Sequence, residues 1–177
     1  MTGALAIGAL APAFTLPDTG GTATSLDPVD SPATIVVFTC NHCPYALAWH
    51  ARLQQVARDY RERGVRMLQI NSNDATRHRR DSPVEMGARV GRGEFAGPYL
   101  RDETQEVARA WGATVTPDVF VLDREGAVAY HGAPDADHAD EALAAGWLRD
   151  ALDDVLARRP VRRAQTRPIG CTVKWRR

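Results

Sequence analysis

The chain has 177 residues, a length typical of one domain with additional segments. Lys and Arg together number 22 and Asp and Glu also number 22, so the formal net charge at pH 7 is zero. This balance argues against a general nucleic-acid-binding protein, which needs a basic surface. The 44% hydrophobic content argues against wholesale disorder. No stretch approaches the roughly 20 apolar residues that span a membrane.

The charges are unevenly distributed along the chain. Residues 1–51 contain no Lys or Arg, whereas residues 158–177 contain eight basic residues and no acid. We therefore expect a domain over residues 1–157 and a basic C-terminal tail over residues 158–177. Such a tail is usually a solvated segment, and docking to an acidic surface is the alternative.

The N-terminal segment and the cysteines indicate the compartment. Residues 4–14 are apolar but lack a positively charged start and are interrupted by Gly8 and Pro12, so they make a poor signal peptide. Three cysteines are too few, and odd in number, for a secreted disulfide framework. We expect a cytoplasmic protein.

The first half of the chain predicts a βαβ unit. The chain up to about residue 30 is predicted to be an extended arm with short strands near residues 14–16 and 22–26. Residues 34–39 form a β-branched and aromatic run that suits a strand buried on both faces. A helix over residues 43–63, stopped by Gly64, and a second strand over residues 65–70 follow. The two strands should be parallel.

The second half predicts further helices and a hairpin. In residues 75–103, which show little periodicity, we expect one helix near residues 83–90 and then a loop. The remaining predicted elements are a helix over 104–111 closed by Gly112, strands over 118–122 and 127–131 joined by a tight turn, and a helix over 140–157. This order predicts an α/β fold: a three-layer α/β/α sandwich with a mixed central sheet.

The strongest chemical signal is Cys40-Asn41-His42-Cys43-Pro44, located where a buried strand ends and a helix begins. A helix N-terminus presents free N–H groups and a positive dipole, which can lower a cysteine pKa from about 8.5 to about 3.5–7.5. The spacing of the two cysteines lets them cycle between dithiol and disulfide, and a proline is well tolerated in the first helical turn. A protonated His42 would stabilise the reduced form, which predicts a potential less negative than the thioredoxin value of about −270 mV.

A metal site is the alternative interpretation of this cysteine pair. Tetrahedral zinc needs four ligands, usually from a second Cys or His pair, and the chain has no second CxxC and no HxxxH. Cys171 and a distant histidine could complete such a site only through the fold. We therefore expect no metal and no other cofactor.

A second signal is Thr116-Pro117, which opens the strand that begins at Asp118. An X-Pro bond is cis in only about 5–6% of cases, so an ordinary proline at the start of a strand is the alternative.

Four segments together resemble the thioredoxin superfamily, in particular its redoxin branch of peroxiredoxins and TlpA/ResA-type thiol oxidoreductases. They are residues 8–18 (GALAPAFTLPD), the strand entering Cys40-Asn-His-Cys43, Val115-Thr-Pro-Asp118, and the hairpin with Asp123-Arg-Glu-Gly126. More narrowly, residues 38–45 and 170–175 look like a peroxiredoxin-like bacterial group.

The resemblance implies a thioredoxin-like fold with an N-terminal extension. Pro117 would be the cis-proline beside the active site, and Thr116 would offer backbone hydrogen bonds to an incoming peptide or disulfide. Cys40 would be the exposed attacking thiol and Cys43 the buried resolving thiol, with Asn41, His42 and Pro44 as neighbours.

The chain departs from the family at three points. Thr39 stands where thioredoxins usually have Trp. If Cys43 is aligned with a peroxidatic cysteine, Cys40 and Val36 stand where the peroxiredoxin Thr and Pro should be, which weakens a peroxidase role. No obvious buried acid corresponds to the thioredoxin proton acceptor, and Asp27 and Asp30 are candidates for that role.

The sequence therefore predicts a thiol–disulfide oxidoreductase in which Cys40 attacks and Cys43 resolves. Its partner would be a protein or small-molecule disulfide or thiol, with no nucleic acid and no membrane, and it would act as a monomer or homodimer. The alternatives are a peroxiredoxin-like thiol peroxidase and a non-enzymatic metal- or thiol-binding module. Cys171 is either a thiol tucked against the domain by Ile169, Val173 and Trp175, or a third redox cysteine.

Overall fold

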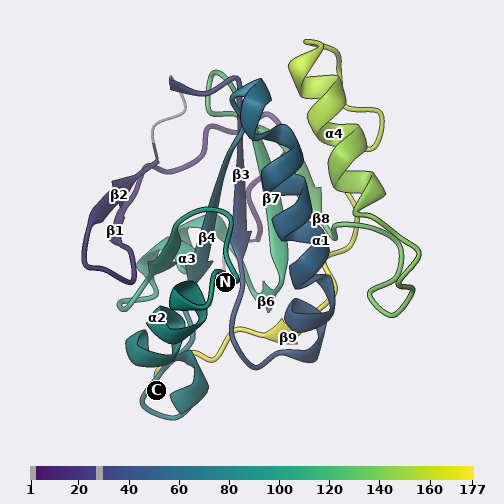
Figure 1. Cartoon of the computed structure of the whole chain (residues 1–177). Coiled ribbons are helices and arrows are strands. Elements are labelled where there is room, and N and C mark those ends of the chain that lie inside the picture. The colour runs from purple at the N-terminus through teal and green to yellow at the C-terminus, as the bar shows by residue number, and fades with distance from the viewer. Residues whose placement is uncertain (1–2, 27–29) are drawn as a thin grey trace.

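The computed structural model describes residues 3–26 and 30–177. Its centre is a five-stranded sheet in the order β5-β4-β3-β7-β8 (Figure 1). The strands are β3 (Ala33–Phe38), β4 (Arg66–Asn71), β5 (Tyr99–Arg101), β7 (Asp118–Asp123) and β8 (Val128–Gly132). β3 is parallel to β4 and antiparallel to β7, so the sheet is mixed, as the sequence predicts.

Helices and short strands surround this sheet. The helices are α1 (Pro44–Tyr60), α2 (Pro83–Gly91), α3 (Glu106–Trp111) and α4 (Gly146–Leu156). Outside the central sheet, β1 (Thr15–Pro17) pairs with β2 (Ala23–Ser25), and β6 (Val115–Thr116) pairs with β9 (Cys171–Thr172). Among the described residues, no helix combines the length and apolar character needed to cross a bilayer.

The central strand β3 is buried on both faces, which explains its continuous apolar run. Because successive side chains of a strand point to opposite faces, Ile35 and Val37 belong to one core and Val36 and Phe38 to the other. The first core lies against α1 and α4, and the second lies against α3 and the N-terminal arm. The predicted three-layer α/β/α arrangement is confirmed.

Helix α1 follows directly after Cys43. It begins at Pro44, whose missing N–H has no cost at the first helical position. Its last turn tightens into a 3₁₀ turn, Arg61–Arg63, and the chain then reverses at Gly64, whose φ of 80° suits a residue without a side chain. The predicted helix over residues 43–63 and its glycine stop are therefore confirmed.

The last helix begins later than predicted: α4 starts at Gly146, not at residue 140. Residues 134–145 form a loop instead, because Asp135 is buried and accepts hydrogen bonds from the Trp49 indole (2.7 Å) and the Ala145 backbone N–H (2.9 Å). Arg52 also donates to Asp135 and to three loop carbonyls. These tertiary contacts outweigh the local helix pattern.

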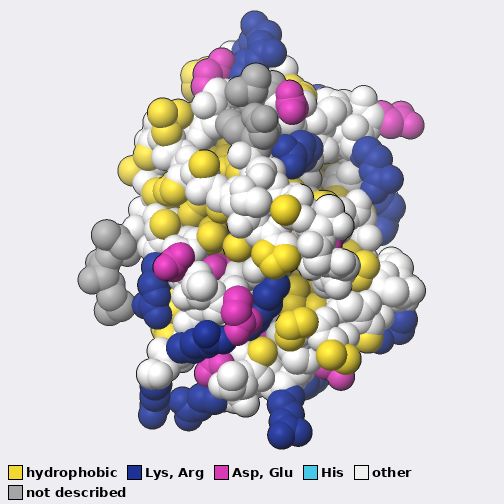
Figure 2. Space-filling view, turned by 90° about the vertical axis from the view of Figure 1, so that its left-hand side faces the viewer, with side chains coloured by type: hydrophobic (Ala, Val, Ile, Leu, Met, Phe, Trp, Pro, Cys, Tyr) yellow, Lys and Arg dark blue, Asp and Glu magenta, His cyan; other side chains and the backbone are white. Residues whose placement is uncertain are grey.

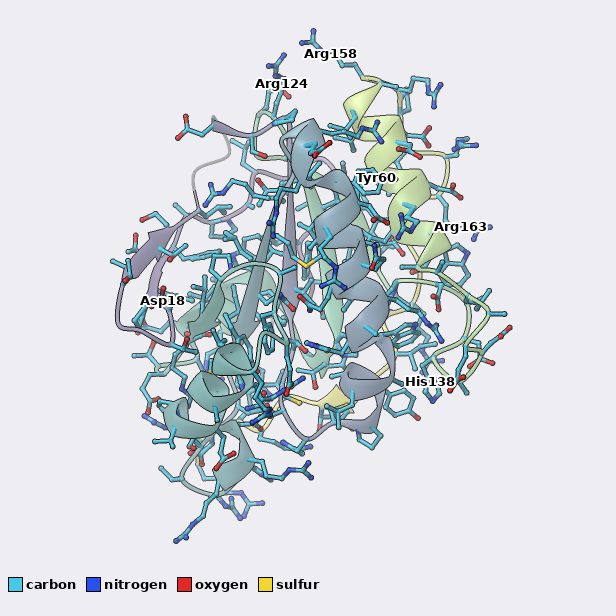
Figure 3. The ribbon with its side chains drawn as sticks, in the orientation of Figure 1. Asp18, Tyr60, Arg124, His138, Arg158 and Arg163 are labelled. Atoms are coloured by element: carbon cyan, nitrogen blue, oxygen red, sulfur yellow. The ribbon has the colours of Figure 1, made fainter. Side chains whose placement is uncertain are left out.

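Residues 158–177 return to the domain rather than extending into solvent. His131 of the edge strand β8 donates its backbone N–H to the Ala164 carbonyl and accepts the Thr166 N–H, and Val173 is buried. In Figure 3, Arg163 lies beside α4, where its guanidinium stacks 4.9 Å above the ring of Trp147. The prediction of a solvated tail is therefore wrong, because apolar side chains within the basic segment pack against the domain.

Three further strands were not predicted. Strand β5 lies within residues 75–103, where we expected a loop after one helix, and it is too short to leave a periodic pattern. Strands β6 and β9 have two residues each and exist only because the C-terminal segment reaches the loop before β7.

Candidate active site

The two cysteines lie where β3 ends and α1 begins. Thr39 continues the β3–β4 pairing through its N–H to the Ile70 carbonyl (2.8 Å), and Cys40 follows at once. Cys43 is the residue that caps α1, with extended backbone, and its N–H donates to the Cys40 sulfur (3.3 Å). The sequence-predicted placement of both thiols at a helix N-terminus is confirmed.

Thr116 faces both sulfurs from the loop before β7. Its hydroxyl is hydrogen-bonded to Cys40 Sγ at 3.3 Å, and its carbonyl oxygen lies 3.0 Å from Cys43 Sγ, where it accepts a hydrogen bond from the thiol. The Thr116–Pro117 peptide bond is cis, as the family resemblance implies. Pro117 is buried, and Pro44 is exposed at the start of α1.

Both sulfurs are covered, which corrects one expectation. Cys40 was expected to be exposed, but it is only 2% exposed, and Cys43 is 0% exposed. The cover is formed by Thr116 and by Tyr45 and Cys171, which pack against Cys40, Cys43 and Ala46. The sequence missed it because Cys171 lies 128 residues from Cys43 along the chain.

The thiols form one coupled group rather than two independent ones. The pKa of Cys43 is lowered to about 4, because its sulfur accepts hydrogen bonds from the thiol of Cys40 and, more weakly, from the thiol and N–H of Cys171. The pKa of Cys40 is raised by that same contact with Cys43, by burial and by the negative charge of Asp81. The two sulfurs therefore share one proton, and the hydrogen bonds around them decide which one is charged: the Cys43 thiol donates to the Thr116 carbonyl, whereas the Cys40 sulfur accepts the Cys43 N–H.

A buried carboxylate, Asp81, organises the residues between the cysteines. Its Oδ1 accepts the Asn41 backbone N–H at 2.6 Å, and its Oδ2 lies 2.5 Å from His42 Nδ1. Asn71 and Asn73 donate to the same two oxygens (3.1 and 2.9 Å), so every hydrogen-bonding position of the carboxylate is in use.

The side chain of Asn41 ties this turn to its surroundings. Its amide donates to the Arg80 carbonyl (2.7 Å), and its oxygen accepts from the Tyr99 hydroxyl (2.9 Å) and the Arg89 guanidinium (3.0 Å). Asn41 is itself buried. It therefore fixes the backbone that presents both thiols.

Sequence reasoning missed Asp81 and suggested Asp27 and Asp30 instead. Asp30 is exposed, and Asp27 lies outside the described residues. Asp81 belongs to the segment 75–103 that showed little periodicity, and no local pattern marks it as buried. Only the folding of that segment over the end of the sheet brings it to the cysteines.

A basic groove lies beside His42. Its ring stacks on His78, with ring centroids 5.1 Å apart, and both line a groove of about 480 Å³ with Arg77, Arg79 and Arg80. Viewed from the β1–β2 side, several Lys and Arg side chains gather at the lower end of the molecule, the end at which Figure 1 places the C-terminus (Figure 2). A negatively charged substrate would be attracted to this end.

Three possible metal ligands also meet here. Ligand atoms of Cys40, His42 and Asp81 all lie within 4.8 Å of one another. Cys171, which the sequence suggested as a ligand, is not part of this cluster and contacts Cys43 instead. The cluster fits a metal poorly, because the Asp81 oxygens are already engaged by four donors.

Solved structures place this architecture among known folds. A hypothetical protein from Sinorhizobium meliloti 1021 is 38% identical, with a TM-score of 0.92 over 98% of this chain and 96% of that chain. An uncharacterized conserved protein from Geobacillus kaustophilus is also 38% identical, with a TM-score of 0.91 over 97% of this chain and 93% of that chain.

More distant structures share the fold. A thiol:disulfide interchange protein of the thioredoxin family from Chlorobium tepidum is 21% identical, with a TM-score of 0.66 over 86% of this chain and 99% of that chain. Peroxidoxin BcpB from Mycobacterium tuberculosis is 18% identical, with a TM-score of 0.61 over 85% of this chain and 94% of that chain. The chain therefore has the thioredoxin-like fold that the sequence predicts.

The family assignment comes from the sequence itself. None of the curated proteins compared with this chain counts as a match. The sequence pattern of the AhpC/TSA family, however, matches residues 7–131, from the N-terminal arm through β8 and across both cysteines. The chain belongs to the AhpC/TSA family of thioredoxin-fold redoxins.

Proposed function

We propose that the protein is a thiol–disulfide oxidoreductase that cycles Cys40 and Cys43 between dithiol and disulfide. The observation that carries the proposal is the contact of the two sulfurs at the N-terminus of α1, opposite the cis peptide of Thr116 and Pro117. A dithiol so placed can form a disulfide without moving the backbone far, since the sulfurs only need to close to about 2.05 Å.

Cys40 is assigned as the attacking residue. Its sulfur is bonded to two hydrogen-bond donors, the Cys43 N–H and the Thr116 hydroxyl, which stabilise a thiolate. The Cys43 sulfur faces the Thr116 carbonyl, which repels a thiolate and favours a thiol. Because the two sulfurs are in contact, transfer of the Cys40 proton to Cys43 places the charge on Cys40 when substrate arrives.

The reaction then proceeds in two exchanges. The Cys40 thiolate attacks one sulfur of a substrate disulfide, the substrate S–S bond breaks, and the other substrate sulfur leaves as a thiolate. Cys43 next attacks Cys40, which releases the second substrate thiol and leaves a Cys40–Cys43 disulfide. Two electrons pass to the substrate, and the reverse sequence oxidises a dithiol.

Insulin reduction with dithiothreitol as electron donor tests the proposal. We expect turnover by the wild-type protein, none by Cys40→Ser, and a mixed disulfide held at Cys40 in Cys43→Ser, identified by mass spectrometry. The outcome that contradicts the proposal is a Cys40→Ser protein that still reduces insulin.

The same purified protein distinguishes the two alternative functions, a thiol peroxidase and a metal-binding module. Consumption of hydrogen peroxide without insulin reduction would favour a thiol peroxidase, in which a sulfenate on one cysteine is trapped by another. One equivalent of zinc in protein purified under reducing conditions, with loss of reactive thiols, would favour a metal-binding module built on Cys40, His42 and Asp81.

We also propose that the protein works in the cytoplasm. Its pair of thiols must be reduced to attack a disulfide, and a reducing compartment maintains that state. Cell fractionation with an antibody against the chain tests this location.

A further inference from the structure

The C-terminal strand β9 brings a third sulfur to the dithiol. We infer that Cys171 is a third redox-active residue, which attacks Cys43 in the oxidised protein and moves the disulfide from Cys40–Cys43 to Cys43–Cys171. This inference rests on the proposed function, because it needs a Cys40–Cys43 disulfide as its starting point.

The three cysteines lie in one cluster. Cys171 packs against Cys40, Cys43 and Ala46, and the Cys43 N–H donates to the Cys40 sulfur at 3.3 Å. The backbone N–H of Cys171 also donates to the Cys43 sulfur at 3.4 Å. Thiol–disulfide exchange needs an attacking sulfur close to the central sulfur of the bond that breaks, and this cluster supplies one.

Strand β9 holds Cys171 in register with the active-site loop. Cys171 pairs with Thr116 and Thr172 with Val115 in an antiparallel ladder, and the Val173 N–H donates to the Thr114 carbonyl at 2.8 Å. Gly170 lies so close to this loop that a Cβ placed on it would be 2.1 Å from the Thr116 carbonyl oxygen. A glycine is therefore required immediately before Cys171.

Hydrogen bonds of the residues that follow Cys171 hold strand β9 in place. Lys174 donates its N–H to the Asn73 side chain and accepts from the Asp74 N–H, both at 2.8 Å. Gln105 donates to the Lys174 carbonyl and accepts from the Arg176 N–H, also at 2.8 Å. The position of Cys171 is thus set by hydrogen bonds on both sides of it.

The exchange balances without an external reagent. The Cys171 sulfur attacks Cys43, the Cys40–Cys43 bond breaks, a Cys43–Cys171 bond forms, and the Cys171 proton ends on the departing Cys40 sulfur. No net oxidation occurs, because one disulfide replaces another. Burial, and then contact with Cys43, raise the pKa of Cys171 to about 11, and the part due to the charge of Cys43 disappears once Cys43 is in a disulfide.

The exchange moves the disulfide onto a sulfur that is more exposed than Cys40 or Cys43. Cys40 and Cys43 are 2% and 0% exposed, whereas Cys171 is partly exposed. A reductant thiol can therefore attack the Cys43–Cys171 bond at Cys171, while Cys40 is returned to its thiol form. Cys171 becomes the point at which electrons enter.

Disulfide mapping in two matched variants tests this relay. The chain has three cysteines, so Cys40→Ala leaves Cys43 and Cys171, and Cys43→Ala leaves Cys40 and Cys171. After treatment with diamide we expect Cys40→Ala to form an intramolecular Cys43–Cys171 disulfide. Cys43→Ala should form its intramolecular Cys40–Cys171 disulfide at least about tenfold more slowly, since proximity governs the rate. Far-ultraviolet circular dichroism checks that both variants fold.

The wild-type chain provides a second measurement. Oxidised wild-type protein should contain both Cys40–Cys43 and Cys43–Cys171 disulfides, and oxidised Cys171→Ser should be reduced by dithiothreitol several-fold more slowly than wild type. A Cys40→Ala protein that keeps two free thiols, or that forms only intermolecular dimers, would overturn the relay and leave the Cys40–Cys43 reaction intact. Failure of wild-type insulin reduction would instead overturn the proposed function and leave the mapping unchanged.

Discussion

At the residue scale, the chemistry depends on which groups surround each sulfur. Asp81 holds Asn41 and His42 in place by hydrogen bonds of 2.6 and 2.5 Å, and its charge raises the pKa of Cys40. The thiol contacts around Cys43 have the opposite effect, because each donates a hydrogen bond to its sulfur. Opposite effects on neighbouring thiols are what a pair with two different roles requires.

Replacement of Asp81 tests its electrostatic role. Asp81→Asn removes the negative charge, so we expect the pKa of Cys40 to fall, and the unfolding free energy to drop by about 1–3 kcal/mol because buried donors lose their acceptor. The pH dependence of iodoacetamide labelling at Cys40, read by mass spectrometry, measures the first effect. Asp150→Asn removes an exposed acid of α4 and should change neither quantity. A Cys40 labelling profile that does not shift would contradict this assignment.

The pH dependence of the thiolate tests the coupled group. Since the shared proton lowers one pKa of the Cys40–Cys43 pair from 9.0 to about 4, the reduced protein should carry a thiolate at pH 7 and lose it only as the pH falls toward 4. Absorbance at 240 nm measures this transition. Cys40→Ala removes the main hydrogen-bond donor to Cys43, so its transition should move to higher pH, and Cys171→Ala should cause a smaller shift. A wild-type transition near pH 9 would show that the sulfur contacts do not stabilise a thiolate.

At the element scale, the loop between β8 and α4 shows how tertiary contacts replace a local preference. Its residues continue the helical pattern, yet Asp135 and Arg52 bind its backbone and α4 starts only at Gly146. The loop also brings His138 against Tyr45, with ring centroids 4.4 Å apart, next to the start of α1 (Figure 3). The loop therefore forms one wall around the cysteines.

Arg52 is the residue on which this loop depends. Its side chain and that of Asp135 are 11% and 3% exposed, so Arg52→Ala leaves a buried carboxylate without its counter-ion. We expect a loss of about 3 kcal/mol in unfolding free energy, measured by urea denaturation. Arg58→Ala, which removes an exposed contact to Gln55 on the same helix, should cost less than about 0.5 kcal/mol. Equal losses in the two variants would contradict the proposed role of Arg52.

At the scale of the whole molecule, the reduced and oxidised forms differ in stability. A thiolate shared by Cys40 and Cys43 is stabilised by the remaining thiol and by the backbone N–H groups of Cys43 and Cys171, and a Cys40–Cys43 disulfide has no equivalent of these contacts. A more stable reduced form makes the disulfide more oxidising. The sequence attributes this effect to His42, whose Nδ1 lies 2.5 Å from Asp81, and the contacts around the two cysteines are a second source of it.

Redox titration against glutathione tests whether the reduced form is more stable than the oxidised form. We expect a potential less negative than about −270 mV, the value for thioredoxin, together with a higher melting temperature for the reduced protein than for the oxidised protein. Each 30 mV corresponds to about 1.4 kcal/mol, so the two measurements must agree in sign and size. A potential at or below that of thioredoxin would show that the contacts around Cys43 do not favour the reduced form.

The sequence by itself determined the layered fold and the place of the dithiol, because both depend on short-range order. A continuous β-branched and aromatic run identifies β3, a period-3.6 apolar pattern identifies α1, and the two cysteines stand at the junction between them. The tertiary structure decided the environment of the sulfurs. Asp81, Thr116 and Cys171 contact Asn41 or Cys43 across separations of 40, 73 and 128 residues. Such contacts leave no local periodicity, since they depend on how the ends of the sheet are covered after the strands have paired.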